Sequence, residues 1–301
     1  MKYLLNLMTV LGVVAAVPLK HRAATTHFFT FGDSYTQSNF DVNGTQPSAG
    51  NPMGNPMGNP MGNPTIGTGT TTGGINWVGD LTTVENSSLV LSYNFAVGGA
   101  SIDNRIVNTN VKDVTTQVGD FELAYGSKPA STPWTSEDSV FGFWIGINDI
   151  GTAYSSNQAS VLVPKLMAQY KSLMEKLYAN GARKFLFLNV PPVSRAPLIL
   201  NQGTDVVKAH AAWLKSYNEG LKAMIDDFKA KNSGTTIVLY DSWTFMTKVL
   251  DSPETYGFPD ATCINDDGTS CVWWNDYHPG QKYHQLQAAD MKPHLQKLGA
   301  W

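Results

Sequence analysis

A serine and a histidine near opposite ends of the chain have the chemistry of a nucleophile and its base. Ser34 stands in Gly32-Asp33-Ser34, directly after three phenylalanines and a threonine at 28–31, a composition that predicts the end of a short buried strand. A serine there is exposed at the rim of a sheet, and a helix beginning at that point would direct free backbone N–H groups at anything bound to it. Gly-Asp-Ser is also a common turn, so its context decides its meaning.

A serine nucleophile needs a base, a group that orients the base, and donors for the developing oxyanion. Of the six histidines, His278 lies in an aromatic loop flanked by a carboxylate and followed by the start of a helix. The others suit surface or packing roles, or fall near the start of the chain: His21, His27, His210, His284 and His294. The sequence therefore indicates Ser34 and His278 as the reactive pair.

Apolar runs alternate with helical patterns along the rest of the chain. Strands are expected at 28–31, 89–96, 140–145, 185–190 and 236–240. Helices are expected from residue 77 to about 81 and at 114–125, 161–178, 206–228 and 281–298. This alternation predicts a parallel sheet covered by helices on both faces, which binds its ligands at the carboxyl ends of the strands. Ser34, Gly99 and Asn148 each follow a strand and are expected at that one edge.

Four short blocks occur in this order: Gly32-Asp33-Ser34, Asn94 with Gly98-Gly99, Gly146-Ile147-Asn148-Asp149, and Asp276-Tyr277-His278-Pro279. Together they resemble the four blocks of the GDSL, or SGNH, hydrolases and extend over nearly the whole chain. The resemblance implies an α/β fold, a three-layer α/β/α sandwich with a central, mostly parallel five-stranded sheet. It implies one hydrolase domain over residues 25–301.

The same resemblance implies a role for each matching residue. Ser34 is expected to be the nucleophile and to donate its backbone N–H to the oxyanion. Gly99 is expected to give a second N–H and Asn148 a third donor from its side chain. Each has a structural alternative: Gly99 suits a tight turn, and Asn148 suits the cap of the following helix. His278 is expected to be the base.

The third member of the triad departs from the family pattern. The family usually has an acid three residues before the histidine, where this chain has Asn275, and the carboxylate of Asp276 lies two residues before. Either Asp276 reaches His278 through a shifted loop, or the pair works with a backbone carbonyl as the orienting group. A neutral amide does not stabilise an imidazolium as a carboxylate does, so we expect Asp276.

The chain also resembles the secreted fungal acetyl esterases of carbohydrate esterase family sixteen, in residues 29–36, 47–52 and 273–280. This implies a serine acetylesterase acting on acetylated plant-wall sugars such as xylo-oligosaccharides, without a metal or organic cofactor. Candidate substrate-binding residues are Asp33, Tyr35, Trp77 and Tyr277; Trp144, Trp273 and Trp274 are further aromatics compatible with stacking on sugar, or with packing in the core. The alternatives are a lipase for longer acyl esters and a sugar-binding or wall-interaction protein without catalysis.

Composition and the ends of the chain indicate a secreted protein. The net charge of −3 over 301 residues gives no basic face for nucleic acid. Residues 1–16 have the pattern of a signal peptide, with a possible short propeptide to about residue 24, and no other segment resembles a membrane span. We expect a monomer.

Two further features fit secretion, and a third is a long insertion. Cys263 and Cys271 are expected to form a disulfide, since they lack the neighbouring histidines of a zinc site. Asn43 and Asn86 begin acceptor triplets for glycosylation. The stretch 43–74, with three copies of Asn-Pro-Met-Gly, predicts a long surface insertion that wraps the body or stays mobile.

Overall fold

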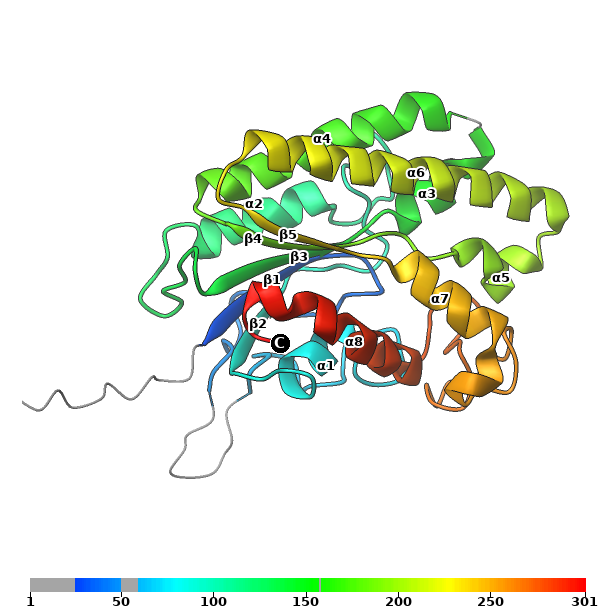
Figure 1. Cartoon of the computed structure of the whole chain (residues 1–301), viewed down its shortest axis with the longest axis horizontal. Helices are drawn as coiled ribbons and strands as arrows, with labels where there is room; N and C mark the ends of the chain where they lie inside the picture. The colour runs from blue at the N-terminus through cyan, green and yellow to red at the C-terminus, as the bar shows by residue number, and fades with distance from the viewer. Residues whose placement is uncertain (1–24, 50–58, 157) are drawn as a thin grey trace, which may run out of the picture.

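Five parallel strands form the centre of the molecule, in the order β2-β1-β3-β4-β5 (Figure 1). The computed structural model describes residues 25–49, 59–156 and 158–301. The strands are β1 (Thr26–Gly32), β2 (Val90–Asn94), β3 (Ser139–Trp144), β4 (Lys184–Leu188) and β5 (Thr236–Tyr240). Every residue of β1 and β3 is buried, as expected of parallel strands covered on both faces. The predicted fold class is confirmed.

The register brings the carboxyl ends of the strands to one edge. Gly32 of β1 pairs with Trp144 of β3, Trp144 pairs with Leu188 of β4, and Leu188 pairs with Tyr240 of β5. Loops that leave these ends therefore meet above the same edge of the sheet, which is where open parallel sheets bind ligands.

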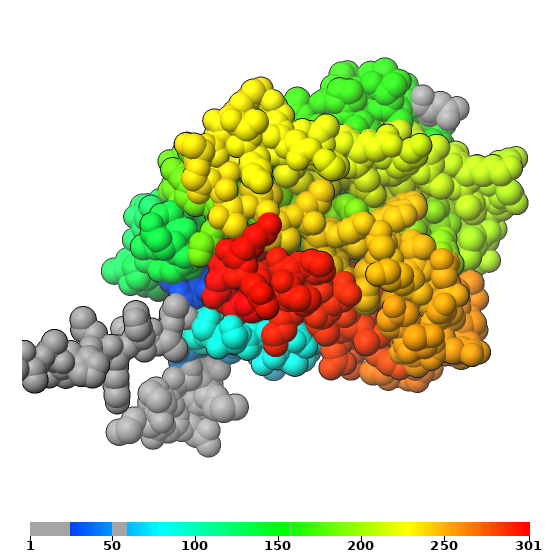
Figure 2. All heavy atoms as spheres, viewed as in Figure 1, coloured from blue at the N-terminus to red at the C-terminus, as the bar shows by residue number. Residues whose placement is uncertain are grey.

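Helices form the outer two layers (Figure 1). One face carries α1 (Trp77–Thr83), α7 (Ser242–Asp251) and α8 (Gln281–Leu295), and the other carries α2 (Val114–Tyr125), α3 (Ile147–Ala153), α4 (Ala159–Ala179) and α6 (Thr204–Lys231). The short α5 (Pro197–Leu200) follows β4. In Figure 2, α8 in red lies at the surface between the cyan segment with α1 and the orange segment after α7. Within the described ranges, no helix is both long and apolar enough to cross a membrane.

Alternating aromatics of β1 anchor both helical layers to the sheet. Phe28 packs edge-on against Trp77 of α1, with ring centroids 6.1 Å apart. Its neighbour Phe29 points to the opposite face and packs against Phe121 of α2 at 4.9 Å. This alternation follows from the two-residue period of a strand. It makes β1 the rigid support of the turn that carries Ser34.

The insertion at 43–74 wraps the body where the structure describes it. In the third Asn-Pro-Met-Gly copy, Met61 is buried and the carbonyl of Pro60 accepts a hydrogen bond from Ser92 N of the edge strand β2. Covering an edge strand protects its unpaired backbone groups. Residues 50–58 of the insertion and the expected signal peptide and propeptide at 1–24 lie outside the described residues.

Candidate active site

Ser34 and His278 lie in contact at the carboxyl edge of the sheet. The Oγ of Ser34 is 2.9 Å from Nε2 of His278, although 244 residues separate them in the chain. Ser34 is largely buried, with 8% of its surface exposed. The sequence-predicted reactive pair is thus brought together in hydrogen-bonding geometry.

Ser34 lies in a single turn at the end of β1, and no helix begins there. After β1 the chain makes one turn, in which the N–H groups of Thr36 and Gln37 donate to the carbonyl of Asp33 at 3.0 and 2.9 Å. It then becomes irregular, and the next helix, α1, begins at Trp77. The insertion also stabilises this turn, because the hydroxyl of Thr71 donates to the carbonyl of Ser34 at 2.7 Å.

The loop that carries His278 is held by backbone hydrogen bonds on both sides. Trp274 N donates to the carbonyl of His278 at 2.8 Å, and Gly280 N donates to the carbonyl of Val272 at 2.9 Å. The side chain of Tyr35, next to the serine, donates its hydroxyl to the carbonyl of Tyr277 at 2.5 Å. The serine turn and the histidine loop are therefore joined directly, which fixes the distance between nucleophile and base.

The side chain beside the other ring nitrogen of His278 belongs to Asn275. Its Oδ1 lies 3.0 Å from Nδ1 of His278 and also accepts the backbone N–H groups of Tyr277 and His278, at 2.9 and 2.7 Å. The two backbone N–H donors identify this atom as the amide oxygen, an acceptor that faces Nδ1. Nδ1 then carries the proton, and Nε2 presents its lone pair to the hydroxyl of Ser34.

The expectation that Asp276 orients the imidazole is corrected by this geometry. Asp276 is exposed, and within the described residues its carboxylate makes no hydrogen bond to the ring. Its backbone carbonyl instead accepts Leu198 N of α5 at 2.8 Å. The physical reason is the turn at Asn275, which closes its own side chain over the loop N–H groups and leaves the next side chain directed outward.

The electrostatic surroundings favour a neutral His278. Burial lowers its pKa to about 4, and the negative charge of Asp276 acts in the opposite direction with a smaller effect. The rings of Trp274 and Tyr277 stand edge-on to the imidazole, with centroids 6.5 and 5.7 Å away. A histidine that stays neutral in weak acid remains able to accept a proton there.

The predicted oxyanion donors lie on the segments that follow β1, β2 and β3. The Nδ2 of Asn148, in the first turn of α3, donates one hydrogen to the carbonyl of Ala100 at 3.0 Å, which leaves the second hydrogen free to bind substrate. Gly99 has a φ of +82°, a conformation that suits glycine. Within the described residues, the backbone N–H groups of Ser34 and Gly99 have no acceptor. The loops after β1, β2 and β3 thus each bring a donor to the carboxyl edge.

Asn148 owes its position to a close contact behind it. Gly146 has a φ of +125°, and a Cβ on it would lie 2.3 Å from the ring of Tyr217 in α6. The hydroxyl of Tyr217 donates to the carbonyl of Ile145 at 2.9 Å. Any side chain at position 146 would push α3, and Asn148 with it, away from the sheet edge.

Three of the four candidate substrate-binding residues are buried and are corrected here. Asp33 is fully buried, accepts Tyr35 N at 3.0 Å, and has its pKa raised to about 7 by burial. Tyr35 and Trp77 are also fully buried, and Trp77 packs among the aromatics of the core. These side chains support the site without reaching substrate. Tyr277 is partly exposed beside His278 and keeps its candidate role.

A buried carboxyl group supports the oxyanion side of the site. Asp149, next to Asn148, is fully buried and accepts Ile102 N at 3.1 Å, and burial raises its pKa to about 7. This contact joins α3 to the loop after Gly99. Sequence reasoning did not assign Asp149 a role, although it belongs to the third block.

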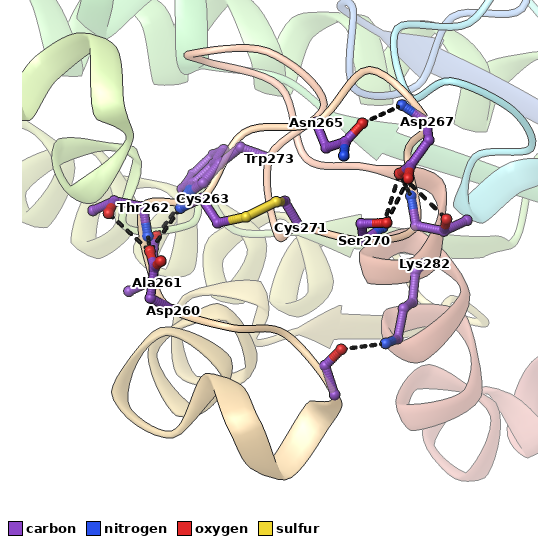
Figure 3. The surroundings of a disulfide bond; sticks show 12 residues. Asp260, Ala261, Thr262, Cys263, Asn265, Asp267, Ser270, Cys271, Trp273 and Lys282 are labelled. Atoms are coloured by element: carbon purple, nitrogen blue, oxygen red, sulfur yellow. Dashed lines mark hydrogen bonds between the residues drawn. A yellow bond between two sulfur atoms is a disulfide. The ribbon is translucent and has the colours of Figure 1, made fainter.

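The predicted disulfide between Cys263 and Cys271 is confirmed (Figure 3). It closes a loop just before the His278 segment, and the N–H of Asn265 donates to the carbonyl of Trp273 at 2.9 Å. Lys282, at the start of α8, donates to the carbonyl of Gly257 at 2.6 Å (Figure 3). Within the described ranges, no three His, Cys, Asp or Glu side chains are grouped to hold a metal ion.

Comparison with known proteins identifies a family and relatives within reach of sequence comparison. A family model described as GDSL-like lipase/acylhydrolase matches residues 28–291. An acetylesterase from Thermothelomyces thermophilus is 41% identical over 94% of this chain and 93% of its own length. The thermolabile hemolysin of Vibrio parahaemolyticus is 29% identical over 60% of this chain and 40% of its own.

Solved structures share the fold at low sequence identity. An acetylxylan esterase from Geobacillus stearothermophilus gives a TM-score of 0.51 at 14% identity, covering 91% of this chain and 94% of its own. An α/β hydrolase from the metagenome of Lake Arreo, Spain, gives 0.52 at 13% identity, covering 92% and 96%. At such identities the likeness shows the fold alone.

Proposed function

The chain belongs to the GDSL-like lipase/acylhydrolase family and is a carboxylic ester hydrolase, and we propose that it removes acetyl groups from carbohydrates. The observation that carries this proposal is the 41% identity with an acetylesterase over nearly the full length of both chains. Acetylated xylo-oligosaccharides are the proposed substrate class.

In the proposed mechanism, Ser34 attacks the acetyl carbonyl while its proton passes to Nε2 of His278. The two groups already lie 2.9 Å apart, so this transfer needs no rearrangement. Negative charge then develops on the carbonyl oxygen, toward the N–H groups of Ser34 and Gly99 and the amide of Asn148. Each such donor typically contributes about 10²–10³ in rate.

The tetrahedral intermediate collapses when His278 returns the proton to the sugar oxygen, which leaves as an alcohol. Ser34 now carries the acetyl group as an ester. A water molecule, deprotonated by Nε2 of His278, attacks that ester and releases acetate with the serine restored. Throughout, Asn275 holds the ring by its Nδ1–H, so that Nε2 faces the serine.

The experiment is a panel of acetylated xylo-oligosaccharides followed by proton NMR, with the Ser34→Ala protein as control. We expect acetyl signals to disappear and free acetate to appear with the wild type alone. Comparison of 4-nitrophenyl acetate with the octanoate tests the acyl preference. Faster hydrolysis of the octanoate, together with stable sugar acetates, would replace the proposal by a lipase.

Secretion, glycosylation and a monomeric single domain over 25–301 complete the proposal. Asn43 is exposed in a turn of the insertion and also lines a groove beside β2. Asn86 is partly exposed, and its side-chain amide donates to the carbonyl of Ser88 at 2.8 Å. Mass spectrometry of protein secreted by a eukaryotic host measures the mature N-terminus and both glycans.

A further inference from the structure

A groove of about 600 Å³ runs along the edge of the sheet beside β2. Its one wall is the segment 39–43, its floor is formed by residues 95–97 after β2, and its other wall is α2 with the residue before its cap. The lining includes Asn39, Phe40, Asp41, Val97, Lys112, Asp120 and Leu123. A volume of this size is typical of small-molecule sites, and the mechanism above makes no use of it.

The groove starts beside the loop that carries Gly99. Val97 lies two residues before Gly99, and its N–H donates to the carbonyl of Gly32 at 3.1 Å. Val111, next to Lys112, lies against Gly99, since a Cβ built on that glycine would be 3.4 Å from a methyl of Val111. The groove therefore leads away from the sheet edge at which Ser34 and Gly99 lie.

The walls of the groove are held in place without a ligand. The ring of Phe40 packs edge-on against Tyr93 and Phe95, with both centroids 6.2 Å away. The amide of Asn63 bonds the backbone of Asp41 in both directions, at 3.0 and 2.9 Å. A preformed site loses less conformational entropy when it binds.

Its lining joins an apolar surface to polar groups. Phe40, Val97 and Leu123 provide apolar contacts, and Leu123 is 87% exposed, which is unusual for leucine. Lys112 pairs with Asp120 at 2.6 Å. Within the described residues, the side-chain amide of Asn39 makes no hydrogen bond, so it is free to bond a ligand.

Such a lining fits a sugar ring better than an alkyl chain. A pyranose has a face of C–H groups bordered by hydroxyls, which require both apolar contact and hydrogen-bond partners. A long acyl chain would leave the Lys112–Asp120 pair and the free amide desolvated without compensation. Asp41 and Asp120 outnumber Lys112, so the charge of the lining disfavours acidic sugars.

We propose that this groove binds the unmodified sugar rings that flank the acetylated ring at Ser34. The inference rests on the proposed function and deepens it: the groove gives the enzyme its preference for oligosaccharides over small acetate esters. The oligosaccharide then runs from the loop that carries Gly99 along α2.

The test compares acetylated xylotetraose with 4-nitrophenyl acetate for the double variant Asn39→Gly/Leu123→Ala. Glycine tolerates the φ of +56° at position 39, and position 123 is exposed, so the fold is expected to persist. We expect kcat/KM for the oligosaccharide, divided by that for the small ester, to fall about tenfold, mainly through KM. The matched control is Val161→Ala, an exposed apolar residue of α4 remote from the groove, which should leave the ratio unchanged.

The outcomes separate the two proposals. A wild-type enzyme that cleaves acetylated xylotetraose, with an unchanged ratio in the double variant, overturns the groove and leaves the proposed function intact. A wild type that cleaves only the small ester overturns the proposed function. In that case calorimetry of the Ser34→Ala protein with acetylated xylotetraose decides the groove: absence of binding overturns it, and binding that the double variant weakens supports it. A selective loss of octanoate hydrolysis would assign the groove to acyl chains and overturn it.

Discussion

The amide oxygen of Asn275 lies 3.0 Å from Nδ1 of His278, in the place where a serine hydrolase ordinarily has a carboxylate. The amide fixes the tautomer and direction of the ring as a carboxylate would, but adds no negative charge to stabilise the imidazolium. Orientation and charge stabilisation, which one side chain usually combines, are therefore separable in this site.

Replacing Asn275 by aspartate should add the missing charge. A carboxylate beside the ring favours the protonated form, so the pKa of His278 rises and turnover at neutral pH increases several-fold. The acid limb of kcat/KM should move up by about one pH unit or more. In the companion variant Asp276→Asn, kcat/KM should change by less than about threefold. A loss above tenfold in that companion, with a silent Asn275→Asp, would return the orienting role to Asp276.

The pH profile of the unaltered enzyme should extend into acid. His278 must be neutral to accept the proton of Ser34, and burial lowers its pKa to about 4. We expect kcat/KM to rise with pH through a midpoint near this value and to level off at higher pH. Circular dichroism at each pH separates loss of activity from unfolding. A midpoint at or above about 6.5, the ordinary value for histidine, would show that burial does not control this group.

Reduction of the Cys263–Cys271 disulfide should lower stability and activity together. A loop this short contributes about 2–3 kcal/mol by restricting the unfolded chain. The same loop pairs with Trp273, and Trp274 bonds the backbone of His278, so loosening it should also disturb the base. Thermal melts and kinetics of a Cys263→Ser/Cys271→Ser variant measure both effects. An unchanged melting temperature would contradict the structural role.

Asp80, buried in α1, should make stability depend on pH. Burial raises its pKa to about 7, with a further contribution from Glu85. The folded state holds the proton of Asp80 more tightly than the unfolded state does. The stabilisation from this proton is therefore complete below the ordinary pKa near 4 and is lost as pH rises through 7. Asp80→Asn should therefore raise Tm by a few degrees at pH 8, with a smaller gain toward pH 4. An equal gain at both pH values would contradict a buried charge as the cause.

The sheet and most of its helices could be predicted because their patterns are regular. The run at 140–145 and the helix at 206–228 have one clear period each. The bounds of β3 differ from the prediction by one residue, and those of α6 by two and three. The short helices α3, α5 and α7 were not predicted. Helices of ten residues or fewer show little periodicity in the sequence and depend on tertiary contacts. No helix begins directly after Ser34: one turn forms, and the chain then follows the insertion.

Some residues of the candidate site could be predicted from motif order, and others depended on burial and loop geometry. Motif order located Ser34, His278, Gly99 and Asn148, but residue type alone did not separate core from cleft, so Tyr35 and Trp77 were expected at the substrate and lie in the core. Asn275 was set aside because charge was weighed and geometry was not. An asparagine two and three residues before Tyr277 and His278 is the pattern of a turn that folds its own oxygen over the loop.

The most direct test of the central claim is the turnover of acetylated xylo-oligosaccharides by the Ser34→Ala protein. The side chain of Ser34 makes its described hydrogen bond to His278 alone, so alanine should leave circular dichroism and Tm close to those of the wild type. Loss of the nucleophile should reduce kcat by about 10⁴-fold or more. A natively folded Ser34→Ala protein that keeps turnover within about tenfold of the wild type would contradict the account.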